Sequence, residues 1–537
     1  SNVQADVRIE EGALLFDSLS AEFPGDTTTE VKGIFSIAQG TPRFDGSLEA
    51  NVGNPSALAR WASELTQSEP LATRAKDVDF QSLRLQTELA LQPSLLQAYS
   101  LSMVAGVEDG KVTLPVTGGL SFALRGRPAL SVELRGASMD VSWFDGFLNV
   151  QNVYDNMDPS SFDANVILGF DELMLAAADL TDVDVSASLS DGVLSVERFS
   201  AVLDGTDEIS AVGTVSNIGP FATGGLEGTI NAGLALSLGG LLLDVAAPSA
   251  DGGVLAYVLR GEVTDAGHVA SLEMSGEVEG SSVSLVANQQ RVQSSPAADK
   301  LDLVLTLENR TAQILLDQFG VVPTAPVDGA GRLRVQVSGQ SEGSLDTSLR
   351  FAAGGFTGLL TGKTNALFEA PQFNGRFEMS APTFGFASQV AGWHGGVVDL
   401  ISANARDGAF VAGGGLEWAS DRIGLSEVEG IAGAFRVSGG GAMEFGGTIP
   451  SFEANINLGS VSLDPLFVAD GVDPWAADPL DWSALADAKG TLALAVSKAS
   501  VADLVLEDIA AKGTLADGVL SFTPVTAELA SGRLTMG

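Results

Sequence analysis

Apolar and polar residues alternate along most of this chain. The segment with Leu333, Val335 and Val337 is one example, and similar runs are separated by Gly, Asn and Asp. A period of two places every second side chain on the same face of a strand, and Gly, Asn and Asp favour the turns between strands. The pattern therefore predicts a mainly β protein made of many short antiparallel strands.

One arrangement of apolar positions occurs three times. Each copy begins with an acidic residue and Gly, continues with period two, is interrupted by two residues, and then resumes with period two. The interruption resets which face is apolar, so it predicts a turn or a bulge inside each copy. The three sets of apolar positions are Leu14, Phe16, Leu19, Ala21 and Phe23; Leu194, Val196, Phe199, Ala201 and Leu203; and Leu520, Phe522, Val525, Ala527 and Leu529.

A tight hairpin turn should open each copy. The pairs Glu11-Gly12, Asp191-Gly192 and Asp517-Gly518 suit the two positive-φ positions of such a turn, which implies an antiparallel partner strand upstream. The upstream spacing of the second copy recurs before the third: Leu180, Asp182, Val183 and Leu189 correspond to Leu506, Asp508, Ile509 and Leu515. We place the repeat units near residues 3–35, 172–214 and 498–535.

Two short helices interrupt the strand pattern. Asn54 and Pro55 supply a cap and a first helical residue for a segment whose apolar residues fall on one face as far as Leu65. A second helix is expected from Thr311 to Phe319, closed by Gly320.

A further motif reads Pro-x-Phe-x-(Gly or Ala)-x-apolar. It begins at Pro42, Pro371 and Pro450. Proline is tolerated at the first residue of a strand, where its missing N–H costs little, so each motif predicts the start of a strand.

The chain shows no clear domain linker. Its best candidate boundary is the polar stretch Asn288–Pro296, which predicts a long loop. We therefore expect a continuous β-repeat array whose first half covers 1–287, a polar loop at 288–300, and a second half at 301–537.

Charge and composition exclude several classes of function. The chain has 28 Lys and Arg against 68 Asp and Glu, a net charge of −40, which repels phosphate and argues against nucleic-acid binding. Cys is absent, so disulfides and thiol chemistry are excluded. The first residues lack the features of a signal peptide, and the most apolar run, Ala232–Leu243, is too short for a membrane span, so we expect neither within this sequence.

Motifs that resemble catalytic or nucleotide-binding sites lack the required context. Gly339–Gly343 matches the G-x-S-x-G pattern around Ser341, but the flanking residues predict strands instead of a strand followed by a helix. Gly358–Thr364 has one residue too few between its glycines for a P-loop. The two histidines, His268 and His394, occur in Gly-rich contexts typical of a surface. We predict no catalytic residues, no metal site and no cofactor.

The apolar repeat positions permit two structures. A closed sandwich would bury them against each other, whereas an open curved sheet would present them to a ligand. The sequence pattern leaves both possibilities open.

The order of these segments resembles the AsmA family, which includes TamB-like proteins of Gram-negative envelopes. The resemblance rests on Pro42–Leu48 with the helix that follows it, on Asp179–Gly205, and on Pro479–Gly532. It implies an elongated, curled antiparallel β-sheet array of the groove or β-taco type with a few short helices. It also implies a periplasmic location, tethering by an inner-membrane helix that is not in this sequence, and conduction of phospholipid toward the outer membrane.

The leading hypothesis is a groove that binds phospholipid, with possible protein partners at either end and edge-to-edge self-association. The alternative is an exported structural or adhesive β-repeat protein without a ligand groove. The residues expected to line the groove are Leu14, Phe16, Leu19, Phe23, Leu194, Val196, Phe199, Leu203, Leu520, Phe522, Val525 and Leu529.

Overall fold

The computed structural model confirms a mainly β protein. The described residues form 29 strands, four α-helices and one short 3-10 helix, η2 (Pro159–Ser161). The structure describes residues 2–38, 40–66, 82–106, 116–123, 126–140, 159–174, 179–203, 207–217, 222–231, 253–264, 267–278, 280–291, 299–340, 343–365, 372–393, 396–405, 408–446, 449–464, 488–501, 504–516, 519–529 and 532–536.

The chain divides into two compact units. Unit 1 comprises residues 1–231 and 256–263, and unit 2 comprises residues 232–255 and 264–537. The boundary expected at 288–300 stays a prediction, although residues 288–291 belong to a strand instead of a loop. Strand pairing continues through Arg291, and the strands on either side of the predicted loop pair with each other, so they share one sheet. Residues 292–298 lie outside the described part.

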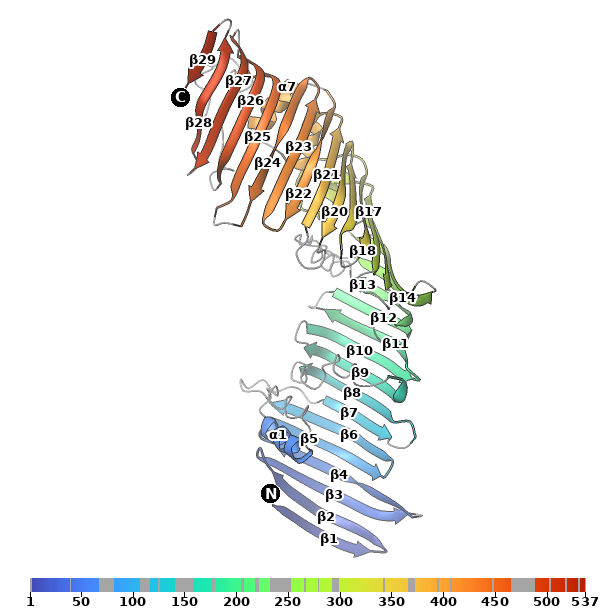
Figure 1. Cartoon of the computed structure of the whole chain (residues 1–537). Coiled ribbons are helices and arrows are strands. Elements are labelled where there is room, and N and C mark those ends of the chain that lie inside the picture. Colours follow the sequence, from blue (N-terminus) through green and yellow to red (C-terminus); the bar gives the residue numbers. More distant parts are fainter. Residues whose placement is uncertain are drawn as a thin grey trace. The chain divides into compact units, whose positions relative to one another are not determined.

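Unit 1 is built from consecutive strands that each pair with the next (Figure 1). All these pairs are antiparallel except β8–β9, which is parallel. The strands are β1 (Val3–Glu10), β2 (Ala13–Phe23), β3 (Thr27–Ala38), β4 (Thr41–Val52), β5 (Ser82–Gln92), β6 (Leu95–Gly106), β7 (Val116–Ala123), β8 (Ala129–Asp140), β9 (Asp163–Met174), β10 (Asp179–Ser190), β11 (Val193–Leu203), β12 (Asp207–Ser216) and β13 (Thr223–Asn231).

Unit 2 repeats this arrangement after β14 (Val254–Thr264), which falls at the division between the units. Its consecutive pairs are antiparallel except β25–β26, which is parallel. The strands are β15 (Gly267–Val278), β16 (Ser281–Arg291), β17 (Lys300–Asn309), β18 (Gly331–Gln340), β19 (Leu345–Ala353), β20 (Phe356–Asn365), β21 (Gln372–Ala381), β22 (Phe410–Ala419), β23 (Arg422–Ala432), β24 (Phe435–Glu444), β25 (Ser451–Ser462), β26 (Lys489–Val501), β27 (Leu504–Ala516), β28 (Val519–Leu529) and β29 (Gly532–Met536).

Long connections recur mostly after every fourth strand. They follow β4, β8, β17, β21 and β25, and also β13, so only the group β9–β13 contains five strands. All four α-helices lie in such connections: α1 (Pro55–Thr66), α5 (Ala312–Gln318), α6 (Phe384–Ala391) and α7 (Gly396–Ala405). The two parallel pairs also occur at long connections, because a parallel pairing needs a crossover.

The predicted turns and bulges are present in the first two repeat copies. Glu11 and Gly12 have φ values of 46° and 82°, and Asp191 and Gly192 have 51° and 75°, as a type I′ hairpin requires. The strand register shifts between Phe16 and Leu19 and between Val196 and Phe199, at the two-residue interruption. In the third copy the pairing of β27 with β28 also shifts, whereas Asp517 and Gly518 lie outside the described residues.

Both predicted helices are confirmed. The Asn54 side chain accepts a hydrogen bond from the Ala57 N–H at 3.0 Å and caps α1. In α5, Ala312 and Leu315 are fully buried as expected, but Phe319 is 40% exposed and Leu316 packs into the core instead.

A buried polar network anchors α5 to the turn between β15 and β16. The Ser281 hydroxyl donates to Gln318 Oε1 at 2.8 Å and accepts from Asn309 Nδ2 at 2.9 Å. The Gln318 Nε2 group donates to the Val278 carbonyl at 3.0 Å. These bonds satisfy polar groups that would otherwise be costly to bury.

Removal of this hydroxyl should destabilise the protein. We expect Ser281→Ala to lower the free energy of unfolding by about 1–3 kcal/mol, because two buried groups lose a partner. Urea unfolding measures the change, with Ser284→Ala at an exposed position of the same strand as the control. Equal stability of the two variants would contradict the assigned role.

The Pro-x-Phe motif has a packing explanation. Gly33 pairs with Gly46, and a Cβ added at Gly46 would lie only 2.7 Å from the Phe44 ring. In unit 2, the ring of Phe373 covers the paired residues Gly362 and Gly375 in the same way. The aromatic side chain thus occupies the space that the two glycines leave free on the sheet surface.

Candidate lipid-binding face

The strand register gathers apolar residues on one face of unit 1. Residues directly opposite each other in a sheet share a face, so one row can be followed across all thirteen strands from β1 to β13. Each member is apolar or Gly: Val7, Phe16, Gly33, Gly46, Leu89, Ala98, Leu120, Val132, Val166, Ala187, Val196, Gly213 and Leu226. We call the side that carries this row the apolar face of unit 1.

Unit 2 has an equivalent apolar face. The corresponding row runs from β15 to β27 without a polar side chain. Its members are Gly276, Val283, Leu307, Leu333, Phe351, Gly358, Met379, Ala412, Gly430, Val437, Leu458, Val496 and Ile509.

The residues predicted to line a groove belong to these faces. The first two copies both lie on the apolar face of unit 1, on β2 and β11, and the third lies on β28 of unit 2. The eight residues on β2 and β11 and Val525 are all half-buried, whereas Phe522 and Leu529 are 38% and 39% exposed. Leu520 pairs with Leu515. Residues of a fully closed core would be less than about a tenth exposed.

Short helices cover one margin of each apolar face. In unit 1, the ring of Trp61 on α1 lies 5.3 Å from that of Phe23 at the end of β2. In unit 2, α5 and α6 contribute to a buried cluster with Ala353, and Phe384 of α6 packs against Phe410 with ring centroids 5.4 Å apart. Asn404 of α7 accepts from the Ser462 N–H at 2.6 Å and so ties this helix to β25.

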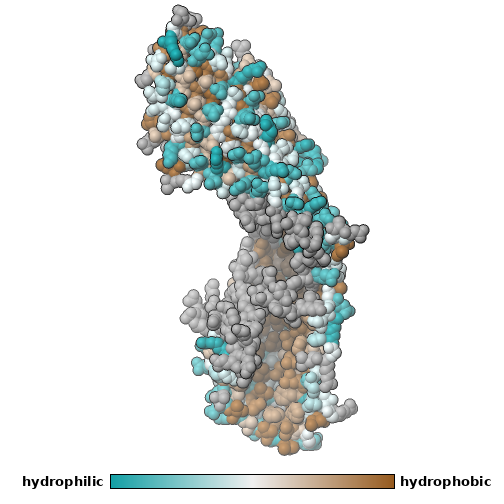
Figure 2. Space-filling model, in the orientation of Figure 1, coloured by the Kyte–Doolittle hydropathy of each residue, from teal (hydrophilic) through white to brown (hydrophobic). Residues whose placement is uncertain are grey.

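The middle of the apolar face in unit 1 is visible at the surface. Figure 2 shows apolar residues between hydrophilic margins on the side of unit 1 that faces the viewer. Part of this face is closed, because Val116, Phe170, Val183 and Ala201 form a buried cluster. Phe199 packs against that cluster, whereas Val196 belongs to the central row.

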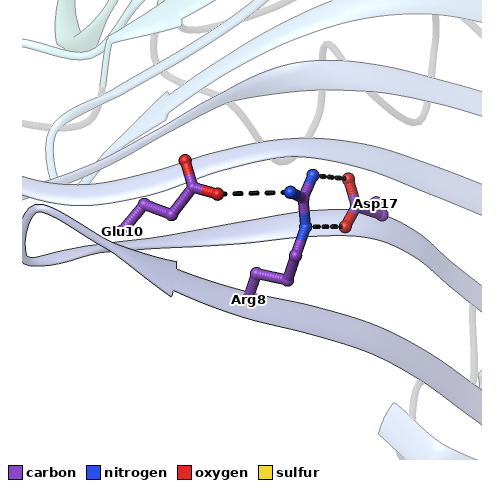
Figure 3. A network of polar contacts seen from close by, with 3 residues as sticks. All are labelled: Arg8, Glu10 and Asp17. Atoms are coloured by element: carbon purple, nitrogen blue, oxygen red, sulfur yellow. Dashed lines mark hydrogen bonds and ion pairs between the residues drawn. The ribbon is translucent and has the colours of Figure 1, made fainter.

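The opposite face of each unit is charged. On unit 1, the Arg8 guanidinium contacts Asp17 through two nitrogens and Glu10 at 3.2 Å (Figure 3). Further ion pairs join Arg198 to Asp184 at 2.7 Å on unit 1 and Arg332 to Glu308 at 2.9 Å on unit 2. We call this side the charged face of each unit.

The contact with Arg8 lowers the pKa of Asp17. The hydrogen bond from Arg8, with its positive charge, holds the pKa of Asp17 below its usual value, although desolvation opposes the shift. We expect Arg8→Gln to raise this pKa toward the usual value, measured by NMR of the carboxyl carbon during acid titration. Arg198→Gln is the control and should leave the pKa of Asp17 unchanged; an unshifted pKa in Arg8→Gln would contradict the assignment.

The sign of the pH effect follows from this lowered pKa. The ion pair stabilises the fold above the usual pKa of aspartate, and its contribution is lost as pH falls through the lowered pKa of Asp17. Because the Arg8 and Asp17 side chains are 55% and 39% exposed, solvent screens the pair and the unfolding midpoint should change little in Arg8→Gln.

The motifs that resemble catalytic or nucleotide-binding sequences do not form a catalytic or nucleotide-binding site among the described residues. Gly358–Thr364 lies within strand β20, and Ser341 and His394 lie outside the described residues. His268 is 5% exposed, so the expected surface position is wrong; it occurs on β15, where its neighbours cover it. Among the described residues, no three metal-ligating side chains cluster and no helix could span a membrane.

The structure defines the chain as a β-repeat array with an apolar and a charged face in each unit. Comparison with protein-family models and with curated proteins finds no match to this chain.

The sequence pattern assigned groove residues to three strands only, whereas the apolar faces extend over many more. The missed members include Leu89, Leu120 and Val132, which alternate with polar residues as the repeat positions do. Their alternation was a usable signal, but only the register shows that they continue the same rows.

Proposed function

We propose that the apolar faces form a groove that binds phospholipid acyl chains and conducts lipid between the inner and outer membranes. The observation that carries this proposal is the unbroken row of apolar residues and Gly across thirteen strands of each unit. Each buried CH₂ is worth about 0.8 kcal/mol, so a lipid chain crosses an aqueous space readily only where its apolar surface stays covered.

The residues of the row favour weak, mobile binding of an acyl chain over tight binding at one position. Glycines such as Gly33, Gly46 and Gly213 leave shallow positions between larger side chains, and no single deep apolar pocket is needed along the row. Weak contacts repeated along the sheet would let an acyl chain slide from strand to strand. A protein of the periplasm that supports outer-membrane assembly, tethered at the inner membrane, fits this behaviour and the resemblance to the AsmA family.

Analysis of co-purified lipid tests the proposal directly. The purified chain is extracted with organic solvent and the extract is analysed for phospholipid by mass spectrometry. We expect bound phospholipid. A lipid-free protein that also fails to bind an apolar dye would contradict the proposal and favour the alternative of an exported structural or adhesive array.

The edge strands should promote self-association. Among the described strands, β1 pairs only with β2, and its Val3 and Ile9 side chains are 66% and 76% exposed. An open strand edge is a template for pairing with another chain. We expect light scattering to detect association that increases with concentration, and Ile9→Lys to reduce it, because an inward-pointing charge protects an edge. A strict monomer at high concentration would contradict this expectation.

A further inference from the structure

Three arginines gather on the charged face of unit 2. Arg332 and Arg334 occupy alternate positions of β18, and Arg350 on β19 lies directly opposite Arg334. Like charges directly opposite each other on antiparallel strands repel. In a chain with 68 acidic and 28 basic residues, such a pair of cations without an intervening anion is unfavourable.

Two of these arginines have no carboxylate partner in the described part of the chain. Arg332 pairs with Glu308, but no described carboxylate lies within ion-pairing distance of Arg334 or Arg350. The Nε of Arg334 is buried and has no hydrogen-bond partner among the described residues. A buried N–H of a cation without an acceptor is costly, so this geometry favours an added acceptor.

A cleft of about 500 Å³ lies over these arginines and extends from β18 to β22. Its floor includes Thr357 and Ser380, whose hydroxyls hydrogen-bond to each other at 2.7 Å, so one of the two keeps a proton that it can donate to a ligand. Glu378 also lines the cleft, but Leu359 separates it from Arg350 in the strand register. The arginines therefore dominate one end of the cleft.

We propose that this cleft binds a phosphate-type oxyanion, either free or as the phosphate group of a larger molecule. Guanidinium groups bind phosphate oxygens through pairs of parallel hydrogen bonds, and the hydroxyl pair of Thr357 and Ser380 can add one more donor. An oxyanion between Arg334 and Arg350 also removes their repulsion. The site lies on the charged face and is independent of acyl-chain binding on the apolar face.

Titration with inorganic phosphate tests this site. We expect saturable binding by calorimetry and a rise in the thermal unfolding midpoint of the wild-type protein. Arg334→Gln and Arg350→Gln should each weaken binding by roughly tenfold or more, since each removes charged hydrogen bonds. Arg436→Gln, on the charged face of β24 outside the cleft, is the matched control and should bind as the wild type does.

A second readout separates binding from general stability. In phosphate-free buffer, Arg334→Gln should unfold at the same temperature as the wild type or higher, because the like-charge pair is gone, yet it should lose the phosphate-dependent rise. An equal rise in the wild type and Arg334→Gln, or no saturable binding at millimolar phosphate, would overturn the proposal.

Vesicles distinguish the source of the phosphate group. Sedimentation with phosphatidylcholine vesicles is compared with and without phosphatidic acid. Retention that requires phosphatidic acid and is lost in Arg334→Gln supports a lipid headgroup as the ligand. Binding of inorganic phosphate without vesicle retention supports a soluble phosphate instead.

Discussion

Val196→Asp should reduce phospholipid transfer between donor and acceptor vesicles by roughly tenfold or more, while the protein remains folded. Val196 lies in the central row of the apolar face of unit 1, between Ala187 and Gly213. A carboxylate there must lose its hydration when an acyl chain passes, which costs several kcal/mol. Fluorescent phospholipid in donor vesicles measures the transfer rate.

The neighbouring residue provides a matched control. Ser195 is on the same strand but faces the opposite side, opposite Ser188 and Thr214. Ser195→Asp adds the same charge and should leave transfer unchanged. Equal loss of transfer in both variants would indicate an effect of net charge, and no loss in Val196→Asp would contradict conduction along this row. Phe199→Asp is less suitable, because Phe199 packs against a buried cluster and its loss should also destabilise unit 1.

Phe373→Ala should lower the free energy of unfolding by about 3–5 kcal/mol, as expected for a buried aromatic residue. Phe373 is 6% exposed and its ring covers the paired glycines Gly362 and Gly375. Removal of the ring exposes the backbone of Gly362 and Gly375 to solvent. It also leaves a cavity, because these two glycines have no side chains to fill the space. Chemical denaturation followed by circular dichroism measures the loss.

The equivalent residue in unit 1 provides a comparison for this loss of stability. Phe44 covers Gly33 and Gly46 but is half-buried, so Phe44→Ala should cost less than Phe373→Ala. Phe373→Leu, which keeps much of the apolar volume, should recover part of the stability. A Phe373→Ala protein that unfolds like the wild type would show that the ring does not support the glycine pair.

Local features of this fold were predictable from sequence. The turns at Glu11-Gly12 and Asp191-Gly192 need positive φ at both residues, and the bulges follow from a break in the period of two. The side chain of Asn54 caps the helix that follows it by accepting a hydrogen bond from the N–H of Ala57, in the first turn. In each case the determining contacts lie close together in the chain.

Features set by distant contacts were not predictable. The parallel pairs β8–β9 and β25–β26 depend on where a long connection returns to the sheet. Helix α6 does have local signals, since Thr383 caps its start and Gly392 ends it, but the strands against which Phe384 packs are distant in the sequence. The apolar faces were only partly predictable, because glycines such as Gly213 and Gly358 belong to the rows but carry no apolar side chain. The cation pair Arg334–Arg350 likewise emerges only from the register.

The grouping of strands by long connections has a consequence for how such a protein changes length. Strands β21 and β25 follow β17 by four and eight antiparallel steps, so all three strands run in the same direction. The long connections that follow them therefore leave from the same margin of unit 2. One added strand would send the next helix to the other margin, whereas four added strands would not. Since neighbouring strands lie about 4.8 Å apart, the array can grow by steps of roughly 19 Å without moving its helices. The length of the array can therefore change in modules of four strands while the connections that carry α5, α6 and α7 stay at the same margin of the sheet.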